Sequence, residues 1–447
     1  MLFIIDVLVL YCALYVALLI RRGVVPTIES WNEHAYHFTF IFAVWLVIFY
    51  ILRLYAFDIP FNSVRFATRL SMAMGIAGLS TALYFYLLPD VPISPKTVLF
   101  VYIVVAYVFI LSWRWLYMAL TSLSPVQNRV AFIGASAESW ETAATLQNRP
   151  QLGYKVSFLY SEDDALFPGQ PADIAVKRTP EALREAFNQF SIMTVVLADH
   201  VSLSVEARRI LFEQVEKGTR FERLQNFYEI YLRRVPLGAI SEAWFLEHID
   251  LRAKRQYLVA KRFVDIVLCL VGLPFVVFMW PLLALLIKLE SSGPVLFSQV
   301  RLGQWSRPFT IHKFRTMRTE QNDQAPTSIN DGRVTAFGSF MRRIRLDELP
   351  QILNILHGDM SLIGPRPERP ELAKDLEAVI PFYRQRHLVK PGITGWDQVS
   401  GEYHSPSVED TYKKLQYDLY YVKNISLFLD LSIFFKTIMT VLSRSGR

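Results

Sequence analysis

Two adjacent carboxylates, Asp347 and Glu348, have the residue types and the setting best suited to chemistry in this 447-residue chain. Arginines crowd residues 342–345 just before them, and Pro350 follows, a residue that a helix tolerates in its first turn. We therefore expect the pair at or near a helix N-terminus, which favours phosphate. Because neighbouring helical side chains point about 100° apart, one carboxylate can attack phosphorus while the other holds Mg²⁺. The alternative is structural, since Asp often caps helices and Glu often occupies a first turn.

Basic side chains that suit phosphate oxygens lie on both sides of this pair. Arg301, Lys313 and Arg315 occur at strand-like spacing in two short stretches, VLFSQVRLG and FTIHKFRTM. Arg366 stands between two prolines, which restrict its backbone to extended forms and reduce the entropy lost on binding. Arginine also grips phosphate through two parallel hydrogen bonds. The alternatives are a basic patch that touches lipid headgroups and an ordinary surface loop.

The remaining candidates for ligand contact are a glycine-rich stretch and the side chains that could bind a metal ion. Residues 389–403 include three glycines, which allow a close approach to a nucleotide or sugar. The two cysteines, Cys12 and Cys269, sit in apolar stretches, and the sequence has no His/Cys cluster of the kind that binds zinc. The available ligands are hard oxygens, so the expected metal is Mg²⁺ rather than Zn²⁺.

The composition places these residues in a membrane protein. Hydrophobic residues make up 52% of the chain, and the formal net charge is +7, with the basic excess concentrated in residues 252–345. This excess suits anionic partners, namely phosphorylated substrates, lipid headgroups or nucleic acid. Four apolar segments, each long enough to cross the hydrocarbon core, predict a bundle of transmembrane helices within residues 1–124. They are Leu2–Ile20, Phe38–Phe57, Leu70–Leu88 and Val98–Leu120.

Residues 125–250 alternate predicted strands and helices, which indicates a parallel α/β unit. Short buried strands are expected at Arg129–Gly134, Val156–Tyr160 and Met193–Ala198, and helices at Pro180–Phe190 and Ser204–Lys217. The turn after the first strand has only one of the three glycines of a dinucleotide fingerprint, because serines occupy the other two positions. We therefore expect a degenerate Rossmann-like domain rather than an NAD-binding one.

A fifth apolar stretch, Phe263–Ile287, is interrupted by Pro274 and Pro281, each of which removes a backbone donor from a helix. Basic residues flank both ends, which favours a re-entrant hairpin over residues 261–290 that enters and leaves the membrane on one face. The acidic Asp265 is expected to pair with a neighbouring basic residue one helical turn away. Near the C-terminus, residues 417–442 combine Tyr, Lys and Asp with a long apolar face, as expected of an amphipathic helix in the interface.

Six segments in order resemble the bacterial sugar transferase family, the monotopic polyprenyl-phosphate sugar-1-phosphate transferases. They are KRFVDIVL, GPVLFSQVRLG, HKFRTM, LDELPQILNILHGDMSLIGPRP, KPGITGW and YDLYYVKNISLFLDL, and the resemblance covers about residues 254–447. The resemblance implies a mainly α-helical catalytic domain over 251–447 with a re-entrant membrane helix and interfacial helices. We expect the residues from about 254 onward to suffice for catalysis. In this chain Glu402 occupies a position where the family often has arginine. This change from a basic to an acidic residue bears on how the donor is recognised there.

The resemblance also implies roles for single residues. Asp347 matches the family's nucleophile and Glu348 its Mg²⁺-associated partner, while Lys313, Arg342 and Arg366 match residues that serve the phosphates. The implied substrates are a nucleoside diphosphate sugar, expected to be a uridine one, and undecaprenyl phosphate, with no nucleic acid. The product would start a capsule, exopolysaccharide or O-antigen unit at the cytoplasmic face of the bacterial inner membrane, and a homo-oligomer is possible.

The residues alone are also compatible with two other classes of protein. One is a membrane-tethered nucleotide-sugar oxidoreductase or epimerase, against which the missing glycines speak. The other is a non-catalytic scaffold for polysaccharide export, against which the intact Asp347–Glu348 pair speaks.

Overall fold

The computed structural model divides the chain into two compact units, Met1–Phe227 and Tyr228–Arg447. It describes residues 2–52, 54–55, 61, 63–87, 96–122, 127–163, 173–199, 201–318, 331–400 and 407–442. Outside these residues lie the predicted helix ends at Phe57 and Leu88, the predicted domain boundary at 124–125, and Glu402.

Four apolar helices open the first unit, as the sequence predicts: α1 (Leu2–Arg22), α2 (Ile28–Ile51), α3 (Val64–Leu87) and α4 (Lys96–Ser122). Together with one helix of the second unit they make five described helices long and apolar enough to cross a membrane. The prediction for α2 was wrong at its start, because the helix begins at Ile28 rather than Phe38. There Thr27 caps it by accepting a hydrogen bond from the Ser30 N–H at 3.4 Å.

A charged pair is buried between α1 and α4. Arg114 donates to Asp6 at 2.7 Å, and both side chains are almost fully shielded from solvent. The rings of Tyr55 and Phe61 lie 5.5 and 5.2 Å from the guanidinium carbon of Arg114. Charges inside an apolar helix bundle are tolerated when they are paired, so this contact sets how α1 and α4 align.

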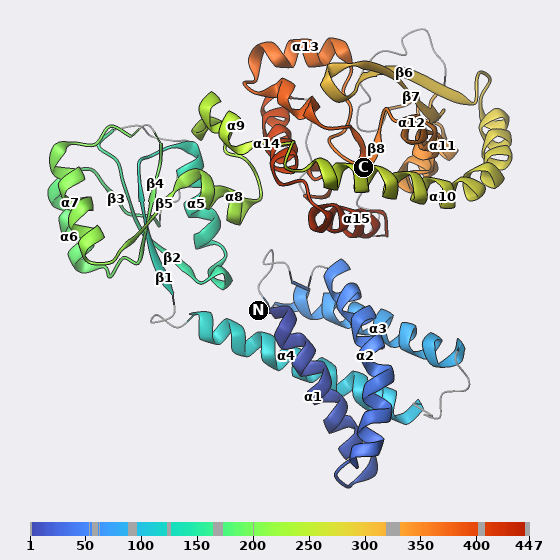
Figure 1. Ribbon diagram of the computed structural model, residues 1–447, viewed down its shortest axis with the longest axis horizontal. Helices are drawn as coiled ribbons and strands as arrows, with labels where there is room; N and C mark the ends of the chain where they lie inside the picture. Colours follow the sequence, from blue (N-terminus) through green and yellow to red (C-terminus); the bar gives the residue numbers. More distant parts are fainter. Residues whose placement is uncertain are drawn as a thin grey trace. The chain divides into compact units, whose positions relative to one another are not determined.

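A five-stranded parallel sheet forms the rest of the first unit, with strand order β3-β2-β1-β4-β5 (Figure 1). Helices α6 and α7 cover one face, and α5 covers the other. The bounds are β1 Asn128–Ile133, α5 Ala137–Gln147, η1 Pro150–Leu152, β2 Tyr154–Tyr160, β3 Val176–Lys177, α6 Pro180–Gln189, β4 Thr194–Leu197, α7 Val205–Glu216 and β5 Arg220–Arg223. Every strand and helix predicted in this region is confirmed, with ends that differ by at most two residues.

The carboxyl edge of this sheet is closed by its own residues. Gly134 has a φ of +100°, and a Cβ built there would come within 2.2 Å of the Val201 side chain. Ser136 caps α5 by accepting from a first-turn N–H at 3.1 Å. Glu162, just after β2, accepts from the backbone N–H and the hydroxyl of Ser204 at 2.9 and 2.7 Å. A dinucleotide pyrophosphate would have to displace Val201 to approach the Gly134 backbone.

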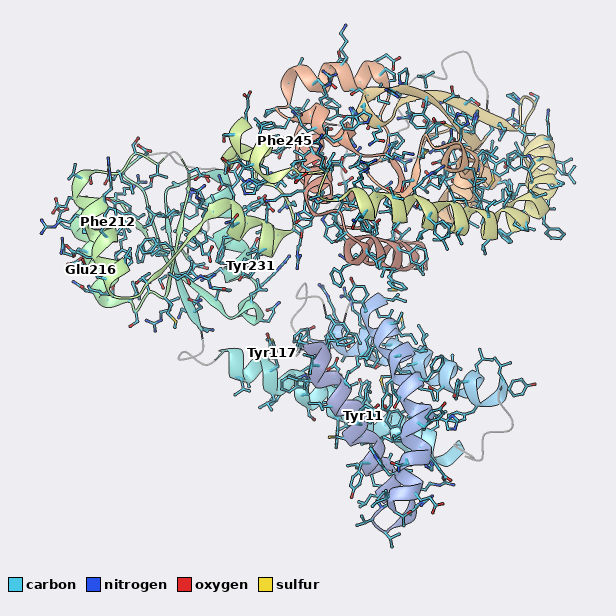
Figure 2. All side chains as sticks on the ribbon, in the orientation of Figure 1. Tyr11, Tyr117, Phe212, Glu216, Tyr231 and Phe245 are labelled. Atoms are coloured by element: carbon cyan, nitrogen blue, oxygen red, sulfur yellow. The ribbon has the colours of Figure 1, made fainter. Side chains whose placement is uncertain are left out.

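The second unit begins earlier in the chain than the boundary expected at residue 250. After α8 (Leu224–Leu232), the segment containing η2 (Leu237–Ala239) and α9 (Glu242–His248) packs into the core of this unit. Its buried residues in that core are Val235, Leu237, Ile240, Trp244 and Phe245. Phe245, labelled in Figure 2, stacks on Phe382 with ring centroids 5.8 Å apart. Residues 228–250 therefore belong structurally with the C-terminal half.

Helix α10 (Arg255–Glu290) is one continuous helix that contains both Pro274 and Pro281, and Figure 1 shows its ribbon turning near its C-terminal end. Only a narrow stripe of it is buried, and residues such as Val271 and Phe278 are exposed. A straight helix of 36 residues would extend roughly 54 Å, well beyond the hydrocarbon thickness of about 30 Å.

The predicted pairing of Asp265 with a neighbouring basic residue was wrong. Asp265 instead accepts from the Ser361 hydroxyl at 2.7 Å and from the Leu362 N–H at 3.3 Å. Lys261 pairs with Asp430 at 2.5 Å, and Arg262 donates to two carbonyl groups of another helix. These groups reach tertiary partners because the helix packs on the domain along that stripe.

The rest of the second unit is mainly helical, with two small sheets. Strands β6 and β7 form an antiparallel hairpin, and β8 pairs with β9 in parallel. The bounds are β6 Leu296–Leu302, η3 Gln304–Ser306, β7 Pro308–Phe314, α11 Ala336–Arg343, η4 Leu346–Gln351, α12 Ile352–His357, β8 Ser361–Ile363, α13 Pro370–Val379, η5 Tyr383–Leu388, β9 Gly392–Thr394, η6 Asp397–Val399, α14 Val408–Asn424 and α15 Leu427–Leu442.

The C-terminal stretch expected to lie as one interfacial helix is two helices. The end of α14 is buried in the domain core, with Tyr417, Tyr420 and Tyr421 all largely inaccessible. By contrast α15 exposes apolar side chains, among them Phe428 and Phe434. Only α15 therefore has the apolar outer face that the prediction assigned to the whole stretch.

Candidate active site

The β6–β7 hairpin and the 3₁₀ turn η4 bring the central residues together. In β7 the alternation of a strand places Lys313 on the face opposite the buried Phe314, and the Lys313 side chain reaches Glu348 in η4. Within η4 lie Asp347 and Glu348, directly before α12 begins at Ile352. The expectation that the carboxylate pair lies at the start of a helix is thus confirmed, with a 3₁₀ turn as its first part.

Asp347 is not the cap of this turn. The residue that precedes η4 is Arg345, which adopts a left-handed backbone with φ 59° and ψ 24°. Among the described residues no backbone N–H donates to the Asp347 carboxylate, so this carboxylate is not used as a helix cap. This geometry goes against the capping interpretation of Asp347.

Glu348 is the centre of a cluster of charges that we call the Glu348 cluster, formed with Lys313, Arg345 and Arg366. Lys313 Nζ and Arg366 Nη2 each donate to Glu348 Oε1 at 3.1 Å. Arg345 Nη1 lies 3.8 Å from the other oxygen, Oε2. Burial alone would raise the pKa of Glu348, but the charges of Arg366, Lys313 and Arg345 outweigh it and lower the pKa to about 2. Glu348 is therefore ionised at any physiological pH.

Asp347 has the opposite electrostatic setting. Burial raises its pKa, and the neighbouring charge of Glu348 raises it further, against the opposing effects of Lys313, Arg366 and Arg342. A carboxylate that is partly desolvated yet surrounded by cations is suited to attack an electrophilic phosphorus. The two adjacent acids thus have different environments, and so different chemistry is available to each.

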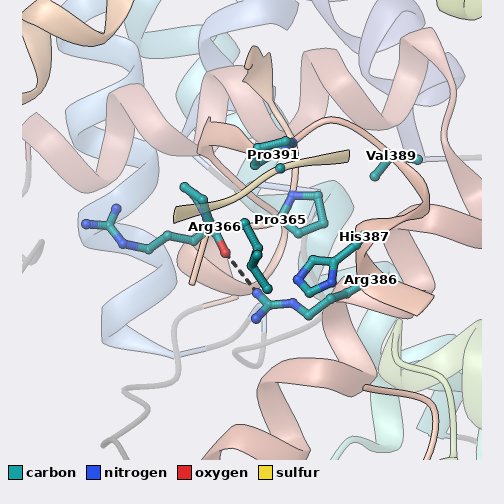
Figure 3. Close-up of a pocket in the computed structure, with 9 residues that line it drawn as sticks. Pro365, Arg366, Arg386, His387, Val389 and Pro391 are labelled. Atoms are coloured by element: carbon teal, nitrogen blue, oxygen red, sulfur yellow. Dashed lines mark hydrogen bonds between the residues drawn. The ribbon is translucent and has the colours of Figure 1, made fainter. Parts of the chain in front are cut away.

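Arg366 is positioned by a tightly packed pair of backbone segments. Gly364 directly follows β8 and lies against Gly392 at the start of β9, so that a Cβ on Gly392 would lie 2.1 Å from the Gly364 nitrogen. The predicted glycine-rich stretch thus uses this glycine for contact within the protein. Arg386 donates from Nη2 to the Arg366 carbonyl at 3.0 Å, drawn as the dashed line in Figure 3, while the Arg366 side chain extends the other way.

Behind this loop lies a small pocket lined by residues that include Pro365, His387 and Val389 (Figure 3). Burial and the charges of Arg386 and Arg384 lower the pKa of His387 to about 4, so its ring is neutral at physiological pH. Arg366 also lines this pocket, and Figure 3 shows its guanidinium pointing away from His387.

The other predicted phosphate residues have different positions. Arg301 donates to the Pro367 carbonyl and to Glu368, each at 3.3 Å, and so braces the loop that carries Arg366. Arg342 donates to the Thr316 hydroxyl at 2.8 Å and is close enough to Asp347 for the two charges to interact. Arg315 is not brought to the Glu348 cluster, because its guanidinium donates to the Ser291 and Ser292 carbonyls at the end of α10.

Sequence reasoning missed Arg345 as a member of the site. The sequence shows its position within the arginine run 342–345, but its contact with Glu348 depends on a left-handed backbone that sequence patterns do not report. It also missed Glu368, whose charge holds Arg301 and Lys414 in place.

The acidic side chains of the site offer few ligands for a metal ion. Within the described residues no group of three or more His, Cys, Asp or Glu side chains is suitably clustered to hold one. Glu348 Oε2 is nevertheless buried and accepts no hydrogen bond. Mg²⁺ commonly takes one or two carboxylates together with substrate phosphates, so this oxygen fits a metal that arrives with a phosphorylated ligand.

The sequence was compared with known protein families and relatives. The model of a family described as "Bacterial sugar transferase" matches residues 256–444. An "Exopolysaccharide production protein PSS" of Rhizobium leguminosarum bv. phaseoli is 41% identical over 199 residues, which are 42% of this chain and 97% of that protein. This chain belongs to the bacterial sugar transferase family.

Two other relatives of this chain carry more specific names. A "UDP-N-acetylgalactosamine-undecaprenyl-phosphate N-acetylgalactosaminephosphotransferase" of Aeromonas hydrophila is 46% identical over 192 residues, 42% of this chain and 45% of that protein. The match therefore spans less than half of that relative. A "UDP-glucose:undecaprenyl-phosphate glucose-1-phosphate transferase" of Klebsiella pneumoniae is 27% identical over 446 residues, 97% of this chain and 93% of that protein. The Glu348 cluster lies wholly within the residues that the family model matches.

Proposed function

We propose that this sugar transferase moves a sugar 1-phosphate from a UDP-sugar to undecaprenyl phosphate. The observation that carries the proposal is the pairing of a permanently ionised Glu348, bound by cations, with an adjacent Asp347 whose carboxylate is partly desolvated. The printed names of the Aeromonas and Klebsiella relatives support these two substrates.

In the proposed reaction an oxygen of Asp347 attacks the sugar-bearing phosphorus of the donor. A bond forms between that oxygen and phosphorus, the bond from phosphorus to the bridging oxygen breaks, and UMP leaves with the electron pair. The product is a phosphosugar linked covalently to Asp347. An oxygen of undecaprenyl phosphate then attacks the same phosphorus and releases the Asp347 carboxylate, giving a lipid-linked diphosphosugar.

The cations of the site would hold the phosphates through these steps. Lys313 and Arg366 face one another across Glu348 Oε1 and would bind the transferred phosphate, while Arg342 stands near Asp347. Glu348 Oε2 would hold Mg²⁺, which when bound neutralises phosphate charge. Arg301 would act indirectly, by keeping the Arg366 loop in place.

The membrane setting completes the proposal. The chain would lie in the bacterial inner membrane with its second unit on the cytoplasmic side, because nucleotide sugars are cytoplasmic. Helix α10 would be re-entrant, supported by its two prolines and basic flanks, and α15 would lie in the interface. The five-stranded unit would be Rossmann-like without a bound dinucleotide, and the product would start an exopolysaccharide, capsule or O-antigen unit.

Mass spectrometry tests this function directly. Purified protein is incubated with a UDP-sugar labelled in the sugar, without lipid, and is then denatured and digested. A labelled phosphosugar on the peptide containing Asp347, absent from Asp347→Asn, is expected together with UMP release. If the wild type releases no UMP from any of a panel of UDP-sugars when lipid phosphate is present, the proposed transfer is wrong.

A further inference from the structure

We infer that Arg345 is a further binding residue for the donor diphosphate, an inference that rests on the proposed function. The three cations of the Glu348 cluster are not equivalent. Lys313 and Arg366 donate hydrogen bonds to Oε1 at 3.1 Å, whereas Arg345 lies 3.8 Å from Oε2 and donates none to it. Arg345 is thus the cation of this cluster that can leave Glu348 without breaking a hydrogen bond.

The backbone of Arg345 points to a role for its side chain. Its φ of 59° lies in the left-handed region, which glycine adopts readily and residues with a Cβ adopt at a cost in free energy. Its N–H donates to the Arg342 carbonyl and its own carbonyl accepts from the Glu348 N–H, each at 3.3 Å. Both bonds are made by the backbone, so glycine would serve the turn better. An arginine in such a position, beside the reacting acids, indicates a function for its guanidinium.

The charge of the site supports the same ligand. With Asp347 and Glu348 ionised, the cations Lys313, Arg342, Arg345 and Arg366 leave an excess of two positive charges. The diphosphate of a nucleotide sugar carries two negative charges, so it balances this excess. Without Arg345 the excess among these side chains would fall to one positive charge.

Movement of Arg345 would also change the charge around Glu348 Oε2. When the guanidinium turns from Oε2 to a phosphate oxygen, its planar donors can form two charge-assisted hydrogen bonds with the ligand. Oε2 is then relieved of the nearby positive charge, which favours its use as an oxygen ligand for Mg²⁺. Donor binding and metal binding would thereby strengthen each other.

The test measures UDP binding to the full-length protein by calorimetry, separately from activity. Arg345→Gly removes the guanidinium and suits the left-handed backbone, and Arg345→Gln removes the charge while keeping a long side chain. Both should weaken UDP binding roughly 10- to 100-fold, the loss expected for charge-assisted hydrogen bonds. Arg345→Gly should also retain or raise the unfolding midpoint. The matched control is Arg343→Ala, an exposed arginine of the same run, which should leave UDP binding unchanged.

The outcomes separate this inference from the proposed function. UDP binding by Arg345→Gly and Arg345→Gln at wild-type affinity, or an equal loss in Arg343→Ala, overturns the inference even if the Asp347 adduct forms. Weakened binding in the two Arg345 variants with no Asp347 adduct in the wild type would support the diphosphate site and overturn the transfer. If the wild type does not bind UDP, the inference is wrong.

Discussion

Lys313 and Arg366 donate to the same carboxylate oxygen, Glu348 Oε1, from two segments that lie on opposite sides of η4 in the sequence. One segment is the end of the β7 strand, and the other is the loop after β8. A single buried carboxylate therefore joins both segments to η4 and separates two positive charges. Glu348 should be important for the stability of the domain as well as for its chemistry.

Glu348→Gln should destabilise the protein by about 1–3 kcal/mol at neutral pH, since it leaves clustered cations without their counter-charge. The folded pKa of Glu348, about 2, lies below its ordinary value of 4.5. The stabilisation is therefore present above 4.5 and is lost as the pH falls toward about 2. Denaturant unfolding across this range measures it. The control is Glu377→Gln, on the exposed side of α13, and equal stability of the two variants would contradict the prediction.

Asp347→Asn should raise the unfolding midpoint at pH 7 while activity falls by several orders of magnitude, on the order of 10⁴ to 10⁶. The folded pKa of Asp347 is raised, so the folded state binds its proton more tightly than the unfolded state does. Its charge therefore costs stability above the folded pKa, and this cost disappears as the pH falls below the unfolded value of about 3.9. Thermal unfolding and UMP release measure the two effects. A lower midpoint or near-normal turnover would be inconsistent with this reasoning.

Gly392→Ala should displace the loop that carries Arg366, because the new Cβ would lie 2.1 Å from the Gly364 nitrogen. Backbone atoms cannot yield as a flexible side chain can, so we expect a lower unfolding midpoint and at least about a tenfold loss of kcat/KM, equivalent to roughly 1.4 kcal/mol. Gly332→Ala is the matched control, since a Cβ there meets no atom within 4 Å. Similar losses in both variants would show that the close approach is unimportant.

A fragment that begins at residue 254 should be unstable, contrary to the sequence-based expectation that it suffices for catalysis. It lacks Val235, Trp244 and Phe245 from the core, and it also lacks Arg233, whose carbonyl accepts from the Trp396 indole at 2.9 Å. A fragment that begins at Leu224, the first residue of α8, should fold and release UMP. Protease resistance and UMP release in membranes compare the two. Equal activity of both fragments would show that residues 228–253 are dispensable.

Single cysteines at positions 256 and 292, near the two ends of α10, should react with an impermeant reagent from the same side of the membrane. Both positions are exposed, and Cys12 and Cys269 are first replaced by alanine. The expectation follows from the prolines within α10 and the basic residues at both ends. Reaction of the two cysteines from opposite sides would identify α10 as a membrane crossing.

Sequence patterns predicted the local elements well because the signals were local. The strands β1, β2 and β4 are short apolar runs next to turn residues, and the four N-terminal helices are long apolar runs. The start of α2 was missed because His34 and other polar residues interrupt the apolar pattern there, although they do not prevent a helix. The true extent of the second unit was also missed, since no local pattern shows which core Val235 or Trp244 packs against.

The sequence predicted which residues form the site better than it predicted the contacts that they make. Asp347, Glu348, Lys313 and Arg366 come together as expected because the expected elements position them. Arg315 looked equivalent to Lys313 two positions earlier, but its side chain caps α10 instead. That difference depends on where α10 ends in space, and spacing along a strand carries no information about it.

The closed carboxyl edge of the five-stranded sheet limits how this unit could be re-engineered. Replacing Ser136 and Ser139 by glycine would complete a dinucleotide fingerprint on paper, yet Val201 would still occupy the space beside Gly134. Ser204 would also still engage Glu162, the acid that follows β2. A cofactor-responsive version would require rebuilding the segment that contains Val201 and Ser204, because restoring the glycines alone would leave this edge occupied.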